Sequence, residues 1–313
     1  MSTRHERPVR KRRSALWRDL SRDRWIYILL LPGIAYFILF KYIPMGGVLI
    51  AFQDYNAFSG FGGSEWVGFK HFERLFAEPS FYRLLRNTLM LSLYNLVLGF
   101  PAPIILALML NELRMKWLKR SIQTMIYVPH FMSWVVVVTM FFVLFESYDG
   151  LFQSWIASLG LDKFTIMMNA DWFRPMYILQ VLWRDSGWGT VIYLAALAGI
   201  SPELYEASRM DGASRLRQIW HITLPGIRST IVILFILKLS DVLDLSFEHI
   251  FLLLNAVNRD VADVFDTYVY RVGLLQGQMS YSTAVGLFKG LVGLVLVSFA
   301  NWFSKKFGEE GIF

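Results

Sequence analysis

The 313-residue sequence contains no cysteine, which excludes disulfide bonds and cysteine-ligated metal sites. It is also poor in charge, because Asp, Glu, Lys and Arg make up 18% of the residues, against about 25% in a typical soluble domain. No segment matches the phosphate-binding pattern GxxxxGK[ST], so we expect no ATP site in this chain. These absences argue against a soluble protein, a disulfide-linked protein and a nucleotide-hydrolysing enzyme.

Hydrophobic residues make up 55% of the sequence, and the mean hydropathy is +0.44. Apolar runs near or above 18 residues recur along the chain, which indicates a protein that crosses a membrane several times. Because a backbone in lipid must satisfy its own hydrogen bonds, we predict an all-α integral membrane protein. The six predicted spans cover residues 25–50, 88–110, 122–145, 175–200, 227–254 and 281–303.

The basic residues predict how the spans are oriented. With a cytoplasmic N-terminus, the segments on that side carry 19 Lys and Arg residues when Arg228 at the edge of the fifth span is included, and the three outside loops carry 8. This asymmetry favours cytoplasmic N- and C-termini, and it accounts for the net charge of +7 without a nucleic-acid partner. We therefore expect a basic tail over 1–24, one six-span domain over 25–304 and a short cytoplasmic tail over 305–313. The first span contains Pro32 and Gly33 and lacks a small-residue cleavage site, so we expect it to be retained.

The outside loops, residues 51–87, 147–174 and 255–280, are rich in Trp, Phe and Tyr. Aromatic residues near a membrane surface usually form an interfacial belt. A surface that receives a binding protein or stacks sugars has the same composition, so both interpretations stay open.

The polar segment 201–226, here called the elbow, separates the fourth and fifth predicted spans. Ser201, Pro202 and Glu203 are typical of a helix start, with an N-cap, a proline at the first position and an acid in the first turn. The dipeptide Asp211-Gly212 then predicts a break, because glycine tolerates a left-handed backbone. A second short helix is expected over 213–221. The elbow is therefore predicted to be a helix-turn-helix on the cytoplasmic surface, and its attachment to two spans excludes a DNA-binding role.

The elbow sequence YEASRMDGASRLRQIWHITLP resembles the EAA signature of ABC-importer permeases, in which this loop docks on an ATPase subunit. Ser208 stands where the signature has its third alanine and is the only departure. The resemblance implies ATPase coupling for the residues of the signature and their neighbours. These are Glu203, Glu206, Ala207, Ser208, Asp211, Gly212, Ala213, Ile222, Leu224 and Pro225.

Other segments extend the resemblance to the oligosaccharide and polysaccharide branch of these permeases, which includes lipoprotein-associated sugar and alginate importers. They are YIPMGGVLIAFQDYNAF, EWVGFKHFERLF, DVADVFDTYVYRVGL and KKFGEEGIF. The resemblance implies a transport subunit of the bacterial plasma (inner) membrane that is not an enzyme and holds no cofactor. It further implies a second permease subunit, giving a heterodimer, two ATPase subunits that use ATP and Mg, and an extracytoplasmic substrate-binding protein.

The fifth predicted span contains four ionisable residues, Lys238, Asp241, Asp244 and Glu248. Their spacing places them on one face of a continuous helix, with Lys238 and Asp241 close enough for an ion pair. Ionisable side chains in a span are costly against lipid, so they should face a wet cavity or one another. One interpretation is a substrate path in which Asp244 and Glu248 bind sugar hydroxyls. The other is an interhelical polar lock that also includes Lys289 of the sixth span.

The fourth predicted span contains the segment WRDSGWG over 183–189. Aromatic faces stack on sugar rings, and Arg, Asp and Ser side chains bind hydroxyl groups, so a sugar path is one interpretation. An Arg184–Asp185 pair with tryptophan packing is the other. Gly187 and Gly189 either loosen this helix or let another helix approach closely. The candidate path residues in this span are Trp183, Arg184, Asp185 and Trp188.

The function that we predict is translocation of a carbohydrate by the permease subunit of an ABC importer. An ABC permease for a non-sugar solute such as a peptide is an alternative that the elbow does not exclude. A proton-driven transporter with Asp241, Asp244 and Glu248 as a relay leaves the elbow unexplained and calls for inverted repeats, which the sequence does not display. Two aspartates alone do not indicate glycoside hydrolysis. His221 and His249 lack metal-ligand companions, so we expect surface or core positions for them.

Overall fold

The computed structural model describes residues 22–145, 150–160, 166–167 and 169–306. Three of its helices are long and apolar enough to cross a membrane, and two further pairs of helices pass the same test if each bent pair counts as one span. The three are Arg24–Phe52, Phe81–Glu112 and Met279–Lys306. The first consists of α2 (Arg24–Phe37), η2 (Ile38–Tyr42), α3 (Ile43–Met45) and η3 (Gly46–Phe52). The second consists of α6 (Phe81–Tyr94), η4 (Asn95–Gly99) and α7 (Pro101–Glu112). The third is the single helix α19 (Met279–Lys306).

The third predicted span is wrong as a continuous helix. It divides into α8 (Lys116–Tyr127), the short η5 (Val128–Phe131) and α9 (Trp134–Phe145), and the chain bends by 104° between the two parts. Pro129 lies in η5, where it cannot donate a backbone hydrogen bond. Ser133 then starts α9, because its Oγ accepts a hydrogen bond from the Val136 backbone N at 3.3 Å.

The fifth predicted span is also wrong as one helix. It consists of α15 (Arg228–Ser240), a turn over 241–246 and α16 (Phe247–Leu253). Ser240 and Asp241 end α15, because the Ser240 hydroxyl donates to the Leu237 carbonyl oxygen at 2.5 Å and lies 3.1 Å from Asp241 Oδ1. Such local side-chain bonds offer the backbone an alternative to helix. The Ser92 hydroxyl, from α6, donates to the Val242 carbonyl and holds this turn against the neighbouring helix.

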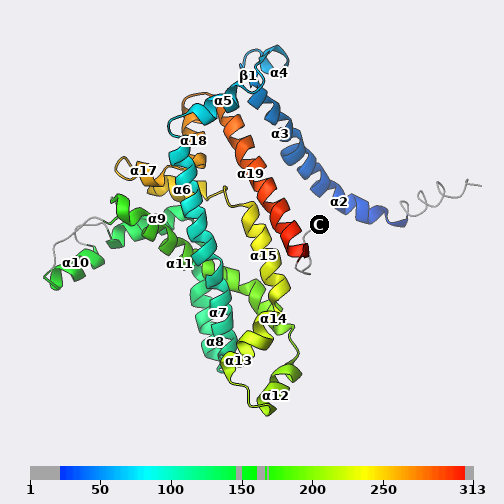
Figure 1. Cartoon of the computed structure of the whole chain (residues 1–313), viewed down its shortest axis with the longest axis vertical. Helices are drawn as coiled ribbons and strands as arrows, with labels where there is room; N and C mark the ends of the chain where they lie inside the picture. The colour runs from blue at the N-terminus through cyan, green and yellow to red at the C-terminus, as the bar shows by residue number, and fades with distance from the viewer. Residues whose placement is uncertain (1–21, 146–149, 161–165, 168, 307–313) are drawn as a thin grey trace, which may run out of the picture.

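The longest uninterrupted α-helix of the described residues, α11 (Ala170–Ala198), runs through the centre of the molecule (Figure 1). Its 29 residues correspond to a length of about 43 Å. Neighbouring helices approach it closely: a Cβ added to Gly187 would lie 1.9 Å from the Ile126 carbonyl oxygen, and one added to Gly189 would lie 2.8 Å from Pro103 Cγ. The expectation that these glycines allow close helix approach is therefore confirmed.

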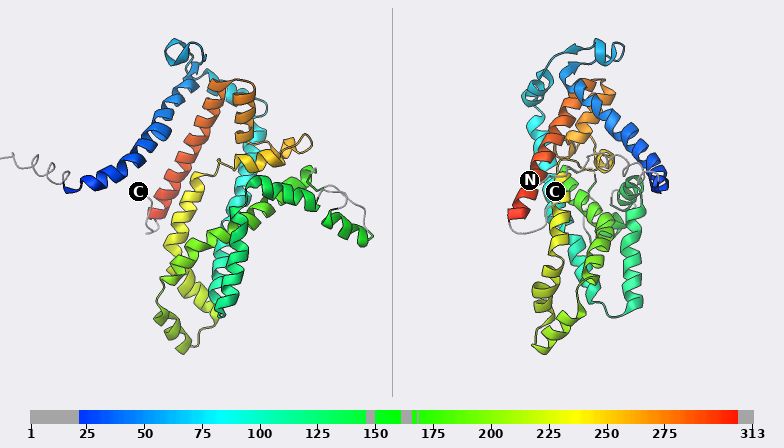
Figure 2. Two further views of the ribbon diagram at one scale, coloured as in Figure 1. Left: turned by 180° about the vertical axis from the view of Figure 1, so that it is seen from behind. Right: turned by 90° about the vertical axis from the view of Figure 1, so that its right-hand side faces the viewer.

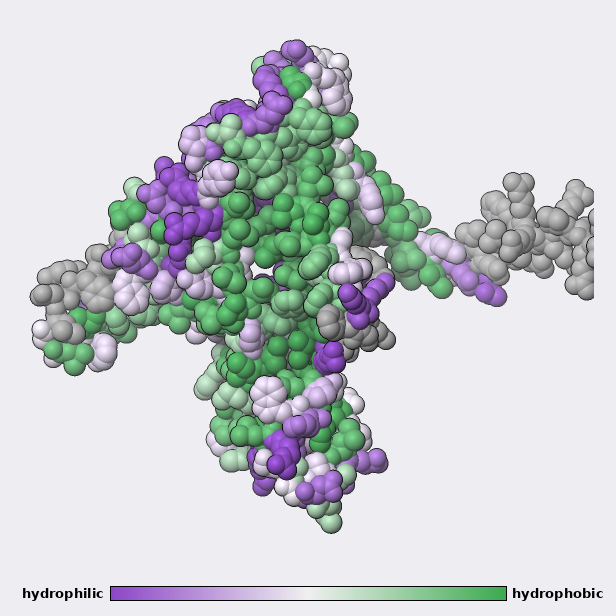
Figure 3. Space-filling model, in the orientation of Figure 1, coloured by the Kyte–Doolittle hydropathy of each residue, from purple (hydrophilic) through white to green (hydrophobic). Residues whose placement is uncertain are grey.

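The first helix, α2, leans away from the rest of the chain and has no buried residue (Figures 1 and 2). Its continuation η3 packs against α19, and Ala51 is buried there. Hydrophobic side chains cover the broad middle of the molecular surface, and hydrophilic side chains gather toward the elbow end and beside α5 and α17 (Figure 3). This banding is the pattern of a chain that crosses a bilayer.

Short elements occupy the two ends of the molecule. At one end lies a small antiparallel hairpin, which the sequence analysis did not predict, and the elbow helix α12 lies at the opposite end (Figure 1). The hairpin region comprises β1 (Gln53–Asp54), α4 (Gly60–Gly63), β2 (Glu65–Trp66) and α5 (Lys70–Ala77). The remaining short helices are α10 (Leu151–Ser158), α17 (Arg259–Ala262), α18 (Phe265–Val269) and η7 (Tyr270–Leu275).

Candidate functional site

The first helix of the elbow is α12 (Pro202–Met210). It starts at Ser201, whose Oγ accepts a hydrogen bond from the Glu203 backbone N at 3.3 Å. It ends in a Schellman arrangement: the backbone N of Ala213 donates to the Ser208 carbonyl at 2.9 Å, and that of Gly212 donates to the Arg209 carbonyl at 3.0 Å. Gly212 has φ of 74°, the left-handed conformation that this ending requires.

The second half of the elbow runs as consecutive helical turns, α13 (Arg215–Gln218), η6 (Ile219–Thr223) and α14 (Leu224–Gly226). It is longer than the helix expected over 213–221. Pro225 lies in its last turn, and the axis then bends by 62° into α15. The predicted helix-turn-helix is confirmed, and its second arm is joined directly to a predicted span.

A hydrogen-bonded lock connects the two arms of the elbow. The Gln218 side-chain amide donates to Ser208 Oγ at 2.8 Å and to the Tyr205 carbonyl at 3.4 Å. The Tyr205 hydroxyl lies 3.0 Å from Thr223 Oγ1. Gln218 is only 9% exposed, so its amide depends on these partners. Ser208, the departure from the EAA signature, therefore supplies a hydroxyl that holds α12 to α13.

The outer surface of the elbow carries both apolar and charged side chains. Met210 is 89% exposed, and Leu204, Leu216 and Trp220 are exposed as well. Glu203, Glu206, Ala207, Asp211, Gly212 and Pro225 are exposed, whereas Ser208, Ala213, Ile222 and Leu224 are half-buried. An exposed apolar group rimmed by charges is typical of a surface that binds another protein.

The elbow also contacts the end of the second long helix. Arg215 Nη1 lies 3.0 Å from Glu112 Oε2 at the end of α7. Beside this ion pair is a cleft of about 500 Å³ between the end of α7 and the elbow, lined in part by Glu206, Arg209 and Gln218. A movement of the elbow would therefore be transmitted to α7 as well as to α15.

The fourth predicted span brings Arg184 and Asp185 into direct contact. Arg184 Nη1 lies 2.8 Å from Asp185 Oδ1, and Arg184 Nε donates to the Met132 carbonyl at 3.0 Å. The guanidinium lies over the Trp134 ring, 4.4 Å from its centroid. Asp185 Oδ1 is also 3.2 Å from His130 Nδ1. The structure therefore contains the Arg184–Asp185 ion pair that the packing interpretation predicted.

The two tryptophans of this span lie in different surroundings. Trp188 stacks on His130, with ring centroids 4.8 Å apart and an interplanar angle of 1°. Trp183 meets Phe141 edge-on with ring centroids 5.8 Å apart. It does not line either of the two cavities beside Asp185 that are described below. The two rings therefore do not form a joint sugar platform.

A stack of rings continues from Arg184 into the core. His249 stacks on Trp134 at 3.7 Å and on Tyr177 at 4.8 Å between centroids. Its Nε2 lies 2.7 Å from Gln180 Oε1. His249 is fully buried, as a core histidine should be, while His221 is exposed on the elbow. No group of three metal-ligating side chains occurs among the described residues.

Two adjacent cavities lie between α11, the α6–α7 helix and α15, with volumes of about 110 and 340 Å³. Both are lined by Asn95, Asp185, Lys238 and Asp241. The smaller one is also lined by Asp244, Trp134 and Tyr177, and by the Ser92 and Ser246 side chains. Four of the predicted path residues therefore meet at one place: Asp185, Lys238, Asp241 and Asp244.

The prediction of one shared helix face is wrong for Lys238, Asp241, Asp244 and Glu248, because α15 ends at Ser240. Their spacing implied one face only for a continuous helix. Lys238 is in the last turn of α15, Asp241 and Asp244 are in the turn, and Glu248 is exposed on α16. The expected Lys238–Asp241 ion pair is not among the ion pairs of the described residues.

Lys289 forms a polar lock instead. Its Nζ lies 3.5 Å from Asp244 Oδ1 and pairs with Asp266 of α18. Lys289 and Asp266 are largely buried, whereas Asp244 is exposed at the cavity. The lock therefore joins α19, α18 and the turn after α15, as the second interpretation of these charges described.

The sequence analysis missed several residues of the cavity wall. Asn95 and Ser92 are polar residues within an apolar helix, which is the signal that could have identified them. The Asn95 side-chain amide donates to the Tyr177 hydroxyl at 2.8 Å. His130 lies in η5, at the break of the third predicted span, and contacts Asp185, while Trp134, just after the break, contacts Arg184.

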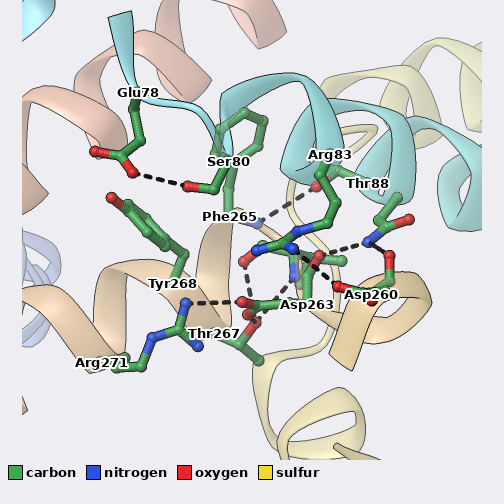
Figure 4. A network of polar contacts seen from close by, with 12 residues as sticks. Glu78, Ser80, Arg83, Thr88, Asp260, Asp263, Phe265, Thr267, Tyr268 and Arg271 are labelled. Carbon is green, nitrogen blue, oxygen red and sulfur yellow. Dashed lines mark hydrogen bonds and ion pairs between the residues drawn. The ribbon is translucent and has the colours of Figure 1, made fainter. Parts of the chain in front are cut away.

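A second polar network, outside the cavities, holds α6 to the loop before α18 (Figure 4). Arg83 pairs with Asp260 at 2.8 Å, and Arg271 pairs with the fully buried Asp263 at 2.7 Å. Thr267 Oγ1 donates to Asp263 Oδ1 at 2.7 Å. Each of these side chains has a partner within the protein, so we assign the network a structural role.

The hairpin end carries a charged pair among exposed aromatic rings. The Lys70 ammonium lies 2.7 Å from Asp54 Oδ2, and this hydrogen bond lowers the pKa of the Asp54 carboxyl below its usual value. Phe58, Trp66 and Phe69 are exposed nearby. Both the belt and the partner-surface interpretations of the aromatic loops remain compatible with this arrangement.

The chain is similar to known transport proteins over nearly its whole length. It is 58% identical over 304 residues to the polygalacturonan/rhamnogalacturonan transport system permease protein YteP of Bacillus subtilis (strain 168), covering 97% of this chain and 95% of that protein. It is 55% identical over 294 residues to Protein LplB of the same organism, covering 94% and 92%. Among solved structures it matches a chain of a bacterial alginate ABC transporter in complex with alginate pentasaccharide-bound periplasmic protein. The TM-score is 0.87 at 39% identity, over 95% of this chain and 99% of the other.

The family described as binding-protein-dependent transport system inner membrane component matches residues 99–309, about two thirds of the chain. That region contains the elbow, the Lys289 lock and most of the residues that line the two cavities. The sequence match, the shared fold and the elbow geometry agree, and the chain belongs to this family of inner membrane components of binding-protein-dependent transport systems.

Proposed function

We propose that this chain is the permease subunit of a bacterial ABC importer that translocates a carbohydrate. The observation that carries the proposal is the match along 97% of the chain to a permease named for polygalacturonan and rhamnogalacturonan transport. The cavities support it, because hydroxyl, amide and carboxylate groups of Ser92, Asn95 and Asp185 lie beside aromatic rings there. Such a lining suits a polyhydroxylated solute.

The cargo that we propose is an oligosaccharide that contains uronic acids. One of the similar proteins is named for transport of polygalacturonan, and similar solved structures are described as importers of alginate. Both polymers are acidic. Lys238 lines both cavities, and none of the ion pairs of the described residues includes it. Its ammonium would balance a sugar carboxylate in a site where an unpaired charge is costly.

The elbow is proposed to be cytoplasmic and to receive the ATPase. In this proposal a second permease completes a heterodimer, two ATPase subunits bind ATP and Mg, and a binding protein delivers substrate on the hairpin side. The lock between Ser208 and Gln218 makes the elbow one body, so that ATPase closure moves both arms together. The bend into α15 then transmits that movement to Lys238 and Asp241.

A proton-driven transporter is disfavoured by the same geometry. A relay through Asp241, Asp244 and Glu248 needs three neighbouring carboxyl groups, but Glu248 is exposed on α16 and does not line the cavity that Asp241 and Asp244 share. Asp244 is instead paired with Lys289.

Uptake by the reconstituted complex tests the proposal. Proteoliposomes containing this chain with the permease, ATPases and binding protein that co-purify with it should import galacturonan oligosaccharides with ATP inside. The same complex should import neutral oligosaccharides of equal length less well. Lys238→Gln should reduce this preference, while Lys41→Gln, in the first predicted span and outside both cavities, should not. Uptake by this chain alone on a pH gradient would refute the proposal, and an unchanged preference in Lys238→Gln would refute the role of Lys238.

A further inference from the structure

A separate, apolar cavity lies on the other side of α15, between α15 and α19, and we call it the α15–α19 groove. Its volume is about 570 Å³. The α15 side is formed by residues such as Ile231, Phe235 and Leu239, and the α19 side by Leu296, Phe299 and Phe303. Nearly all of its wall is hydrocarbon, unlike the walls of the two cavities near Asp185, so it does not suit a sugar.

The length of the groove corresponds to one leaflet of a bilayer. On α15 it runs from Arg228 to Leu239, twelve residues, or about 17 Å along a helix. Half of a hydrocarbon core of about 30 Å is about 15 Å. Beyond Leu239 the two helices meet: a Cβ added to Gly293 would lie 3.0 Å from the Ser240 carbonyl oxygen. This contact closes the groove at about the length of one leaflet, and a separate cavity of about 430 Å³ lies beyond it, lined in part by Leu243, Asp244 and Lys289.

The other end of the groove is polar and basic. Arg228 begins α15 at the elbow end and lines the groove, and Lys305 and Lys306 occupy the last turn of α19. Ser304 also lines the groove, is only 7% exposed, and its hydroxyl has no hydrogen-bond partner in the described part of the chain. A buried hydroxyl without a partner indicates a missing acceptor.

We propose that the α15–α19 groove binds an anionic glycerophospholipid from the leaflet on the elbow side. One acyl chain lies between Phe235 and Phe299, and the glycerol ester or phosphate oxygens accept a hydrogen bond from Ser304. Arg228, Lys305 and Lys306 provide the positive charge that selects an anionic headgroup, as basic pockets between membrane helices do. A helix of a second subunit is the other conceivable occupant, but a spanning helix needs a groove across both leaflets.

Photolabelling tests the proposal on the transporter complex in nanodiscs. Phosphatidylglycerol and phosphatidylcholine would each carry a photoreactive group in the acyl chain, and labelled residues would be mapped by mass spectrometry. We expect phosphatidylglycerol to label the groove residues of α15 and α19, well above phosphatidylcholine. Equal labelling by the two lipids, or equal labelling of Leu291 on the exposed side of α19, would overturn the proposal. The experiment needs no sugar, so its outcome is independent of the proposed cargo.

Two further measurements separate lipid binding from packing. A photoreactive amino acid at Phe299 should capture lipid, and capture of another permease subunit would show that the groove is a subunit interface and overturn the proposal. Ala300→Trp, which fills the groove, should abolish preferential labelling, whereas Leu291→Trp should leave it unchanged. The pair Lys305→Gln and Lys306→Gln should lower the preference for the anionic lipid about thirtyfold. The map on the unmodified complex decides the question even if a variant fails to fold.

Discussion

Removal of one hydroxyl group should loosen the elbow. In Ser208→Ala the Gln218 amide loses its 2.8 Å acceptor and keeps only the Tyr205 carbonyl at 3.4 Å. A buried donor left without a partner costs about 1–3 kcal/mol. Because one weak bond remains, we expect the lower end, about 1 kcal/mol, which corresponds to roughly fivefold more frequent local opening.

Hydrogen exchange of the purified full-length chain in nanodiscs measures this opening. Peptides that cover residues 205–218 should exchange about fivefold faster in Ser208→Ala, while peptides from α19 should be unchanged. Ser229→Ala is the matched control, because Ser229 is an exposed serine just beyond the elbow and outside the lock. Substrate-stimulated ATP hydrolysis by the assembled complex should fall in Ser208→Ala and not in the control.

A double variant distinguishes the hydrogen bond from simple loss of packing. Replacing both partners by apolar groups is nearly neutral, whereas leaving one polar group alone is not. Ser208→Ala combined with Gln218→Leu should therefore exchange more slowly than Ser208→Ala alone. If the double variant exchanges faster, or if Ser208→Ala exchanges like the parent chain, the lock does not hold the elbow and the reasoning fails.

Three further substitutions test other parts of the structure. Gly187→Ala should lower the thermal unfolding temperature, with a cost of about 3 kcal/mol, because its Cβ would overlap the Ile126 carbonyl. Gly286→Ala is the control, because a Cβ at Gly286 meets nothing within 4 Å. Equal unfolding temperatures of the two variants would contradict the close approach at Gly187. Glu206→Lys should abolish ATPase coupling while the chain still inserts in the membrane, and normal substrate-stimulated ATP hydrolysis would count against the elbow role. Arg184→Ala should impair uptake while the ATPase still co-purifies, and uptake at the parent level would rule out the proposed path.

The elbow could be predicted from the sequence because its determinants are local. An N-cap serine, a proline in the first turn and a glycine at the left-handed position act within a few residues of one another. The lock could not be predicted in this way, since Ser208 and Gln218 lie on different arms. Sequence similarity placed Ser208 in the signature, and only the folded elbow explains why a hydroxyl occurs there.

The breaks in the third and fifth predicted spans were missed because hydropathy does not register backbone hydrogen bonds. Pro129 was a visible signal for the first break, and Ser240-Asp241 was one for the second. The partner of Lys289 was missed for a different reason. Asp266 belongs to a short helix in a predicted outside loop, and its contact with α19 depends on how that loop folds back.

The break after Ser240 connects the separate features of this chain. The 13-residue helix α15, about 20 Å long, has the elbow bend at one end and Lys238 with the polar turn at the other. A tilt of the elbow would therefore turn α15 as a lever and shift Lys238 and Asp241 within the cavities. The same tilt would change the distance between α15 and α19, which form the lipid groove. The proposed phospholipid thus lies where it can bias the movement that couples ATPase closure to the cavity, and the Ser240 carbonyl against Gly293 is the contact about which the two helices would pivot.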